Sequence, residues 1–246
     1  MRALLLAATA YVAACVIDGE APRDLAQPAL RFVRGEPTPG ARDVPIDTPI
    51  DLYFSVPLAA EGLREGSVAL HSGLVQSSLR LRVDLLEGRL RARPDVVLRP
   101  DLDYRLVVNA GLHAIDGSRL AAPVAFSFTT GNTRVPPPPP PRAPSAAELQ
   151  PLWSARCVEG CHGAATARAG LDLSTPAAAL RGLRNVASDQ SDLLRVVPGD
   201  HARSYLLRKL LAGAPTRGLP MPPSASPLTA EELRLVADWI DAGALP

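Results

Sequence analysis

The 246-residue sequence predicts two folded units of different class, an antiparallel β-sandwich followed by an all-α unit. Between residues 30 and 131, hydrophobic residues alternate with polar ones, which is the period of half-buried strands. After residue 145 the hydrophobic residues recur at helical spacing and follow helix-start signals. Six consecutive prolines, 136–141, separate the two patterns and predict a linker.

Composition narrows the functional classes. The net charge is +1, so the chain lacks the basic excess of nucleic-acid-binding proteins. Aromatic residues make up only 4% of the chain, and the cores must therefore be built mainly from Leu, Val and Ala. The three cysteines, Cys15, Cys157 and Cys161, are too few and too unevenly placed for a disulfide-stapled scaffold.

The first 14 residues predict an export signal. Met1-Arg2 carries positive charge, and Ala3 to Ala14 is an uncharged, mostly apolar run. The run is shorter than the roughly 20 apolar residues needed to span a bilayer. The following residues, 15–29, show no periodicity and predict a tether.

The end of this signal, Val12-Ala13-Ala14-Cys15, resembles the lipobox of bacterial lipoproteins. The resemblance implies that Cys15 is diacylated and becomes the first mature residue. The protein would then be anchored to a membrane of the cell envelope, on its periplasmic or outer-membrane face. The alternative is a signal peptide cut near Ala14, which leaves a soluble exported protein with a spare thiol.

Four alternating segments predict strands in the first unit. They cover residues 50–55, 79–85, 104–108 and 124–129. Turn-forming residues separate them, among them Glu87-Gly88, Arg93-Pro94-Asp95 and Asp116-Gly117. Several short strands within about 100 residues predict a sandwich. The segment from Thr48 to Ser55 and the closing Phe126-Ser127-Phe128-Thr129-Thr130-Gly131 resemble the bacterial Ig-like module. This resemblance implies a spacer or an interaction surface.

The linker covers residues 132–144. Its proline run predicts a polyproline II rod that rises about 3.1 Å per residue and is semi-rigid. We therefore expect the linker to hold the two units apart.

Helix signals organise the second unit, residues 145–246. Ser145 and Glu148 form a capping box, and so do Thr229 and Glu232 before a final helix that should stop at Ala242-Gly243. Between them, Pro176 can open a short helix and Asp200 can cap a helix over 201–211.

The chemistry centres on Cys157-Val158-Glu159-Gly160-Cys161-His162. This segment is one residue longer than C-x-x-C-H, the motif for covalent attachment of c-type haem. In such a site the thiols bond to the haem vinyl groups and the histidine binds iron. The extra residue requires a local bulge, which Gly160 can best provide.

The order of cysteines, histidine, helices, a Met221-Pro222 loop and a last helix resembles small monohaem cytochrome c domains over nearly all of 145–246. The resemblance implies one covalent haem c, attached through Cys157 and Cys161. It implies iron ligation by His162 and Met221. It also implies a haem environment containing Tyr205, Leu206 and Trp239. The expected function is one-electron transfer with redox partner proteins. With both axial positions filled, we expect no enzymatic activity.

Three alternatives remain open from the residues. Cys157 and Cys161 could form a disulfide in a haem-free surface structural or adhesion lipoprotein, whose binding module is the Ig-like unit. Cys157, Cys161, His162 and His201 could bind zinc. His201 could replace Met221 as the distal haem ligand, or it could be a surface residue at a helix start.

Overall fold

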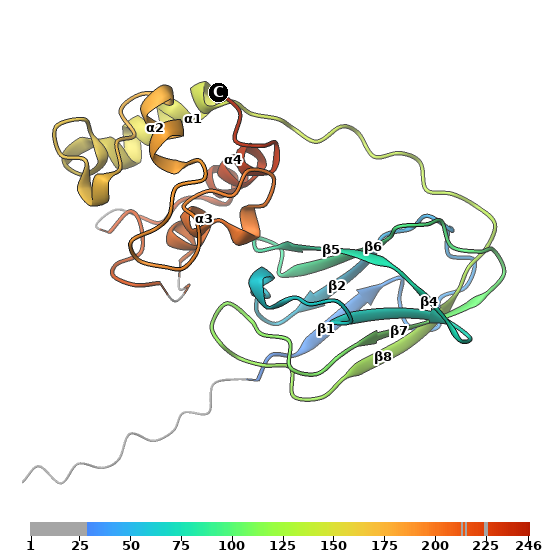
Figure 1. Cartoon of the computed structure of the whole chain (residues 1–246). Coiled ribbons are helices and arrows are strands. Elements are labelled where there is room, and N and C mark those ends of the chain that lie inside the picture. The colour runs from blue at the N-terminus through green and yellow to red at the C-terminus, as the bar shows by residue number, and fades with distance from the viewer. Residues whose placement is uncertain (1–28, 213, 215, 224–225) are drawn as a thin grey trace, which may run out of the picture.

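The computed structural model describes residues 29–212, 214, 216–223 and 226–246, which form two units joined by an extended segment (Figure 1). The predicted signal, the lipid attachment at Cys15 and most of the tether lie outside these residues. Within the described ranges, no helix is long and apolar enough to cross a membrane.

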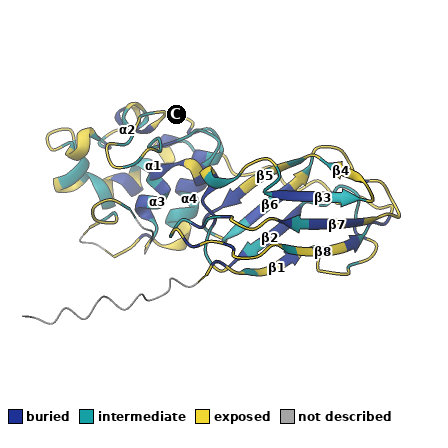
Figure 2. Cartoon of the chain, turned by 60° about the horizontal axis from the view of Figure 1, so that its bottom comes forward, coloured by how far each residue is buried: buried dark blue, intermediate teal, exposed yellow. Residues whose placement is uncertain are grey.

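The N-terminal unit consists of two four-stranded antiparallel sheets that form a sandwich (Figure 1). In spatial order, one sheet contains β1 (Phe32–Glu36), β2 (Ile50–Phe54), β6 (Arg89–Pro94) and β5 (Leu79–Asp84). The other contains β4 (Val75–Ser77), β3 (Val68–Ser72), β7 (Asp103–Val108) and β8 (Val124–Thr129). A short 3-10 helix, η1 (Ala60–Gly62), lies between β2 and β3 in the chain. Both sheets carry buried residues, coloured dark blue in Figure 2, and these residues form the core of the sandwich.

The four predicted strands are present as β2, β5, β7 and β8, with the core on their apolar faces. The predicted turn at Arg93-Pro94 is wrong, since both residues belong to β6 and Pro94 lies opposite Leu79 in the ladder. Pro94 is tolerated because it lies beyond Ala92, the last residue of β6 that pairs with β2. Strand β6 was not predicted from the sequence because its arginines mask the short apolar alternation of Leu90 and Ala92.

The C-terminal unit is helical. Its elements are α1 (Ala146–Trp153), the π-helical segment η2 (Ser154–His162), η3 (Arg168–Gly170), α2 (Pro176–Leu183), η4 (His201–Arg203), α3 (Tyr205–Leu210) and α4 (Ala230–Asp241). Both predicted capping boxes are formed, at Ser145 and at Thr229. The backbone N–H of Ala146 donates to the carbonyl of Leu245, so the first helix is tied to the end of the chain.

The helix predicted over 201–211 is divided into η4 and α3. Ser204 separates them because its backbone is extended, with φ −94° and ψ 119°. The Ser204 hydroxyl fixes this break, since it donates to the Asp200 carbonyl at 2.8 Å and accepts from the Val197 N–H at 2.9 Å.

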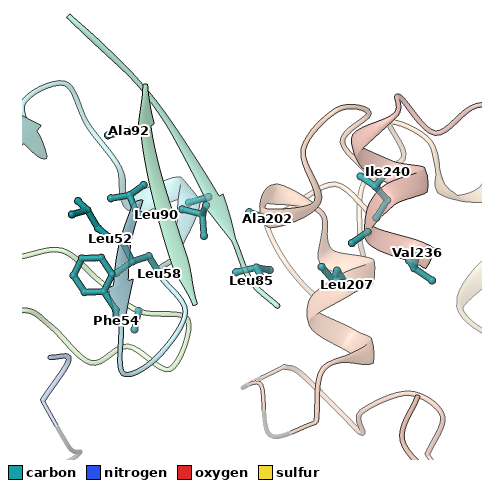
Figure 3. Packing of buried hydrophobic residues seen from close by; sticks show 14 of the residues in the cluster. Leu52, Phe54, Leu58, Leu85, Leu90, Ala92, Ala202, Leu207, Val236 and Ile240 are labelled. Carbon is teal, nitrogen blue, oxygen red and sulfur yellow. The ribbon is translucent and has the colours of Figure 1, made fainter. Parts of the chain in front are cut away.

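The expected separation of the two units is wrong. The linker is extended and exposed, but it curves from one unit to the other and does not hold them apart (Figure 1). The end of β5 and η1 contact η4 directly. Leu85 from the sandwich lies beside Ala202 and Leu207 of the helical unit, and all three are buried (Figure 3). Proline content stiffens a linker but does not set its path, and burial of these side chains favours docking.

Candidate functional site

The helical unit contains a cleft that is open to solvent and has a cavity volume of about 110 Å³. Its lining combines apolar and polar side chains: Trp153, Cys157, His162, Ala169, Leu171, Leu173, Leu183, Ser188, Asp189, Gln190, Arg195, Tyr205, Leu206, Lys209, Leu210 and Met221. The cleft thus collects residues from α1, η2, α2, α3 and the segment before α4.

The cysteine segment enters the cleft from α1. η2 continues α1 without interruption until Glu159, where the backbone becomes extended (φ −65°, ψ 124°). Gly160 then takes a left-handed conformation, with φ +67°. This reversal absorbs the extra residue between the cysteines, as expected for the residue type that adopts positive φ without strain.

The two cysteines differ in their surroundings. Cys157 lines the cleft, whereas Cys161 is half-buried outside its lining. Burial raises the pKa of the Cys157 thiol to about 11, against the opposing charge of Arg156. Both thiols are free, so the disulfide considered for this pair is not formed in the structure.

His162 is oriented by the backbone that follows it. Its Nδ1 lies 3.2 Å from the carbonyl oxygen of Leu171. When Nδ1 carries the proton and donates to this carbonyl, the lone pair of Nε2 is free for a metal, as in most ligating histidines. The N–H of Leu173 donates to the His162 carbonyl at 2.7 Å and fixes the same segment.

Met221 reaches the cleft from the segment between α3 and α4. Its N–H donates to the carbonyl of Lys209 at 2.8 Å. The Lys209 ammonium donates to the carbonyls of Arg217 at 2.5 Å and Leu219 at 2.8 Å. Lys209, the only lysine in the chain, is therefore a functional candidate that was not predicted from the sequence.

The side chains predicted to surround the haem divide into two groups. Tyr205 and Leu206, at the start of α3, line the cleft. Trp239 does not, which corrects its expected role. It is fully buried in the core, and its Nε1 donates to the Leu245 carbonyl at 2.9 Å. Trp153 lines the cleft instead, and its spacing of four residues before Cys157 places both on one helical face.

Buried polar atoms of the cleft residues lack partners. The Nε1 of Trp153 and the hydroxyl of Tyr205 make no hydrogen bond within the described part of the chain. Burial raises the pKa of Tyr205, which keeps its hydroxyl protonated as a donor. Because an unpaired buried donor is costly, these atoms favour a bound group that carries acceptors. The surrounding leucines favour a group that is otherwise apolar.

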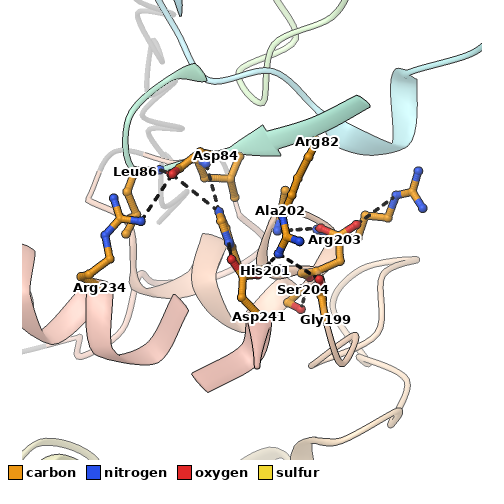
Figure 4. Close-up of polar contacts among 12 residues, drawn as sticks. Arg82, Asp84, Leu86, Gly199, His201, Ala202, Arg203, Ser204, Arg234 and Asp241 are labelled. Carbon is orange, nitrogen blue, oxygen red and sulfur yellow. Dashed lines mark hydrogen bonds and ion pairs between the residues drawn. The ribbon is translucent and has the colours of Figure 1, made fainter. Parts of the chain in front are cut away.

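His201 has a different role from those considered for it. It is buried at the contact between the units, where its Nδ1 donates to Asp241 Oδ2 at 2.9 Å (Figure 4). Its Nε2 accepts from the Leu85 N–H at 3.2 Å. It is therefore neither a surface residue nor a lining residue of the cleft. The zinc set is not assembled, and the described residues contain no cluster of three or more His, Cys, Asp or Glu suited to a metal.

Two family models match separate parts of the chain. Residues 26–130 match a model described as a bacterial Ig-like domain. The two-sheet sandwich of the first unit fits an Ig-like domain. Such a domain is typical of extracellular or surface proteins. Residues 157–225 match a model described as Planctomycete cytochrome C, and this match begins at Cys157 and includes His162 and Met221.

Similarities to solved structures are weak. The L,D-transpeptidase 1 of Mycobacterium tuberculosis is 16% identical over 42% of this chain and 40% of its own, with a TM-score of 0.29. An L,D-transpeptidase of Mycobacterium smegmatis is 21% identical over 42% and 41%, with a TM-score of 0.31. The copper resistance protein PcoC of Escherichia coli is 16% identical over 41% and 98%, with a TM-score of 0.33.

This chain thus spans less than half the length of either transpeptidase. At these TM-scores the similarities carry no functional argument. No curated protein matches the chain.

Proposed function

We propose that the helical unit binds one haem covalently and transfers single electrons. The observation that carries this proposal is the meeting of Cys157, His162 and Met221 in one cleft, although Met221 is far from the other two in the sequence. The match of 157–225 to a cytochrome family supports the same assignment.

The roles follow from residue chemistry. The thiols of Cys157 and Cys161 would form the two thioethers, while His162 and Met221 would be the axial ligands. When bound, haem supplies a one-electron ferric/ferrous couple. The Leu171 carbonyl orients His162, and the leucines of the cleft exclude water. The unpaired donors of Trp153 and Tyr205 can bind acidic substituents of the cofactor.

The proposed activity is electron carriage and not catalysis. If His162 and Met221 both bound the iron, no position on it would be left for a substrate. The partners would be other redox proteins, with no role for nucleic acid. We further propose that the protein is exported and that a lipid on Cys15 anchors it to a membrane of the cell envelope, a location compatible with its Ig-like domain.

Haem attachment is tested by producing the full chain in a host with c-type haem-attachment machinery. We expect a pyridine haemochrome spectrum, and a mass increase of one haem that persists after denaturation. The double variant Cys157→Ala/Cys161→Ala should lack the covalent haem. A colourless wild-type protein whose cysteines are free or joined in a disulfide would refute the proposal and favour the haem-free surface protein.

Distal ligation is tested by Met221→Ala. In the haem-loaded protein we expect loss of the weak absorption band that reports a sulfur–iron bond, together with a lower midpoint potential. Leu219→Ala is the matched control, because Leu219 is exposed in the same segment. An unchanged band in Met221→Ala would exclude Met221 as the ligand.

A further inference from the structure

The Ig-like domain contacts the wall of the cofactor cleft, and we propose that it is a positioning element of that cleft. In this proposal Glu61 and the end of β5 hold η4 and α3 against the cofactor. The inference rests on the proposed function, because it assigns the sandwich a task at the same site.

The first observation is that α3 has two occupied faces. Tyr205, Leu206 and Lys209 line the cleft. Arg208 pairs with Glu61 of the sandwich. The buried side chain of Leu207 points toward Leu85 of the sandwich in Figure 3. Displacement of α3 from the sandwich would therefore move cleft residues with it.

The second observation is a bidentate ion pair between Arg208 of the helical unit and Glu61 of the sandwich. Arg208 Nη1 lies 2.9 Å from Glu61 Oε1, and Nη2 lies 2.6 Å from Glu61 Oε2. The Arg208 side chain is only 12% exposed, so its charge is largely removed from water. A bidentate pair of this kind fixes the relative orientation of the two side chains as well as the distance between them.

The third observation is a cluster around His201, which stands at the start of η4 just before α3 (Figure 4). The backbone N–H of Leu85 in the sandwich donates to His201 Nε2. Arg82 of β5 donates to the Gly199 carbonyl at 3.0 Å and pairs with Asp241 Oδ1 at 2.7 Å. The sandwich therefore contacts the segment 199–201 at more than one point.

These contacts matter because α3 is short. It covers six residues, and its N-cap Ser204 makes no capping hydrogen bond to it. A helix of this length is not stable by itself and depends on its packing partners. The sandwich supplies part of that packing, and the cleft wall should loosen when it is lost.

The experiment uses a reporter that the sequence provides. Both tryptophans, Trp153 and Trp239, lie in the helical unit, so tryptophan fluorescence reports unfolding of that unit alone. Full-length Glu61→Arg and Arg208→Glu, prepared without haem, should each lower the folding equilibrium constant of the helical unit about fivefold. That factor corresponds to about 1 kcal/mol for a partly buried pair.

The double variant Glu61→Arg/Arg208→Glu should recover most of the loss, since the pair is restored in reverse. Glu65→Arg is the matched control, because Glu65 is an exposed acid of the same loop. An unchanged fluorescence transition in Glu61→Arg would overturn the proposal, and so would strictly additive effects in the double variant.

A second arm measures the cofactor site in the haem-loaded protein. If α3 is loosened, added imidazole should reach the haem iron more easily. Its affinity should therefore rise severalfold in Glu61→Arg but not in Glu65→Arg. A shift in unfolding without a change in imidazole affinity would show a purely structural contact and overturn the positioning role. Failure to load haem would refute the proposed function instead, while the fluorescence arm still decides whether the units are coupled.

Discussion

Lys209 is a cleft residue whose ammonium binds the segment that carries Met221. It is the only lysine in a chain that otherwise uses arginine for its basic residues, and it is buried beside the cleft. A compact ammonium can donate to two backbone carbonyls in a space where a planar guanidinium fits less well. Burial lowers the pKa of Lys209, and its two carbonyl acceptors, those of Arg217 and Leu219, offset the cost of that burial.

We predict that Lys209→Met loosens the segment carrying Met221. The substitution retains much of the apolar stem but leaves two carbonyls without their donor, which should cost about 1–3 kcal/mol of stability. Chemical denaturation measures the stability, and hydrogen exchange of residues 216–223 measures local opening. Arg181→Met, on the surface of α2, is the control. Unchanged exchange in Lys209→Met would show that the ammonium does not hold the segment.

At the same scale, Cys157 should be a poor nucleophile in the haem-free chain. With a pKa of about 11, it is about 0.1% thiolate at pH 8. Alkylation by iodoacetamide, followed by peptide mass mapping, should therefore modify Cys157 more slowly in the folded protein than after denaturation. Equal rates in the two states would contradict the burial of this thiol.

The same shift predicts a pH effect of definite sign. The folded state holds the Cys157 proton more tightly than the unfolded state, whose thiol ionises near its ordinary value of 9.0. This group's contribution to stability is therefore complete below pH 9 and is lost as the pH rises towards 11. Cys157→Ala should reduce the loss of stability over this range, as measured by denaturation at several pH values.

At the scale of elements, local chemistry could be predicted and tertiary placement could not. The capping boxes at Ser145 and Thr229 were predicted because each is encoded within four residues. The break at Ser204 depends on Val197 and Asp200, partners that helical periodicity does not reveal. Trp239 was misplaced for a similar reason, since an amphipathic pattern identifies a buried face but not what covers it.

The turn at Gly160 provides a test at this scale. Its φ of +67° is strained for a residue with a side chain, although a methyl group there would meet no atom within 4 Å. Gly160→Ala should therefore cost about 1 kcal/mol through backbone conformation alone. Thermal unfolding measures the cost, and the fraction of chains with covalent haem measures the effect on attachment. Gly73→Ala, between β3 and β4 in the sandwich, is the control for strain outside the motif, because Gly73 also has a positive φ (+57°) and no atom within 4 Å of the added methyl group.

If Gly160 positions the second cysteine, Gly160→Ala should reduce haem attachment while Gly73→Ala should not. Equal attachment in both variants and the wild type would mean that the extra residue is accommodated without this turn. The sequence alone singled out Gly160 because positive φ strongly favours glycine, and that inference required no knowledge of tertiary contacts.

For the whole molecule, the docking of the two units was the feature that the sequence predicted least well. The pairs that join them, such as Glu61 with Arg208 and Asp84 with Arg234, connect residues about 150 positions apart. Each side chain alone is typical of a solvated surface, and only the fold brings the partners together. The proline run suggested separation because composition indicates stiffness but not direction.

The docked arrangement should open in acid. Burial acts to raise the pKa of Asp241, but its hydrogen bond to His201 and the charge of Arg82 hold it below the ordinary value of 3.8. Burial acts to raise the pKa of Asp84 as well, but the charges of Arg234 and Arg89 hold it below its ordinary value. For Glu61, the hydrogen bond and charge of Arg208 outweigh burial and lower its pKa below 4.5.

Carboxylates with lowered pKa values stabilise the folded arrangement fully above their ordinary pKa and lose this contribution as the pH falls through the lowered one. We therefore predict that the radius of gyration, measured by small-angle X-ray scattering, increases below about pH 4, the region of these ordinary pKa values. Far-ultraviolet circular dichroism should change less, because the linker lets the units separate before either unfolds. Asp241→Asn should shift the expansion to higher pH, since one of the charges that joins the units is already absent. Simultaneous loss of compactness and secondary structure would show that the two units unfold as one, a stronger coupling than their contacts suggest.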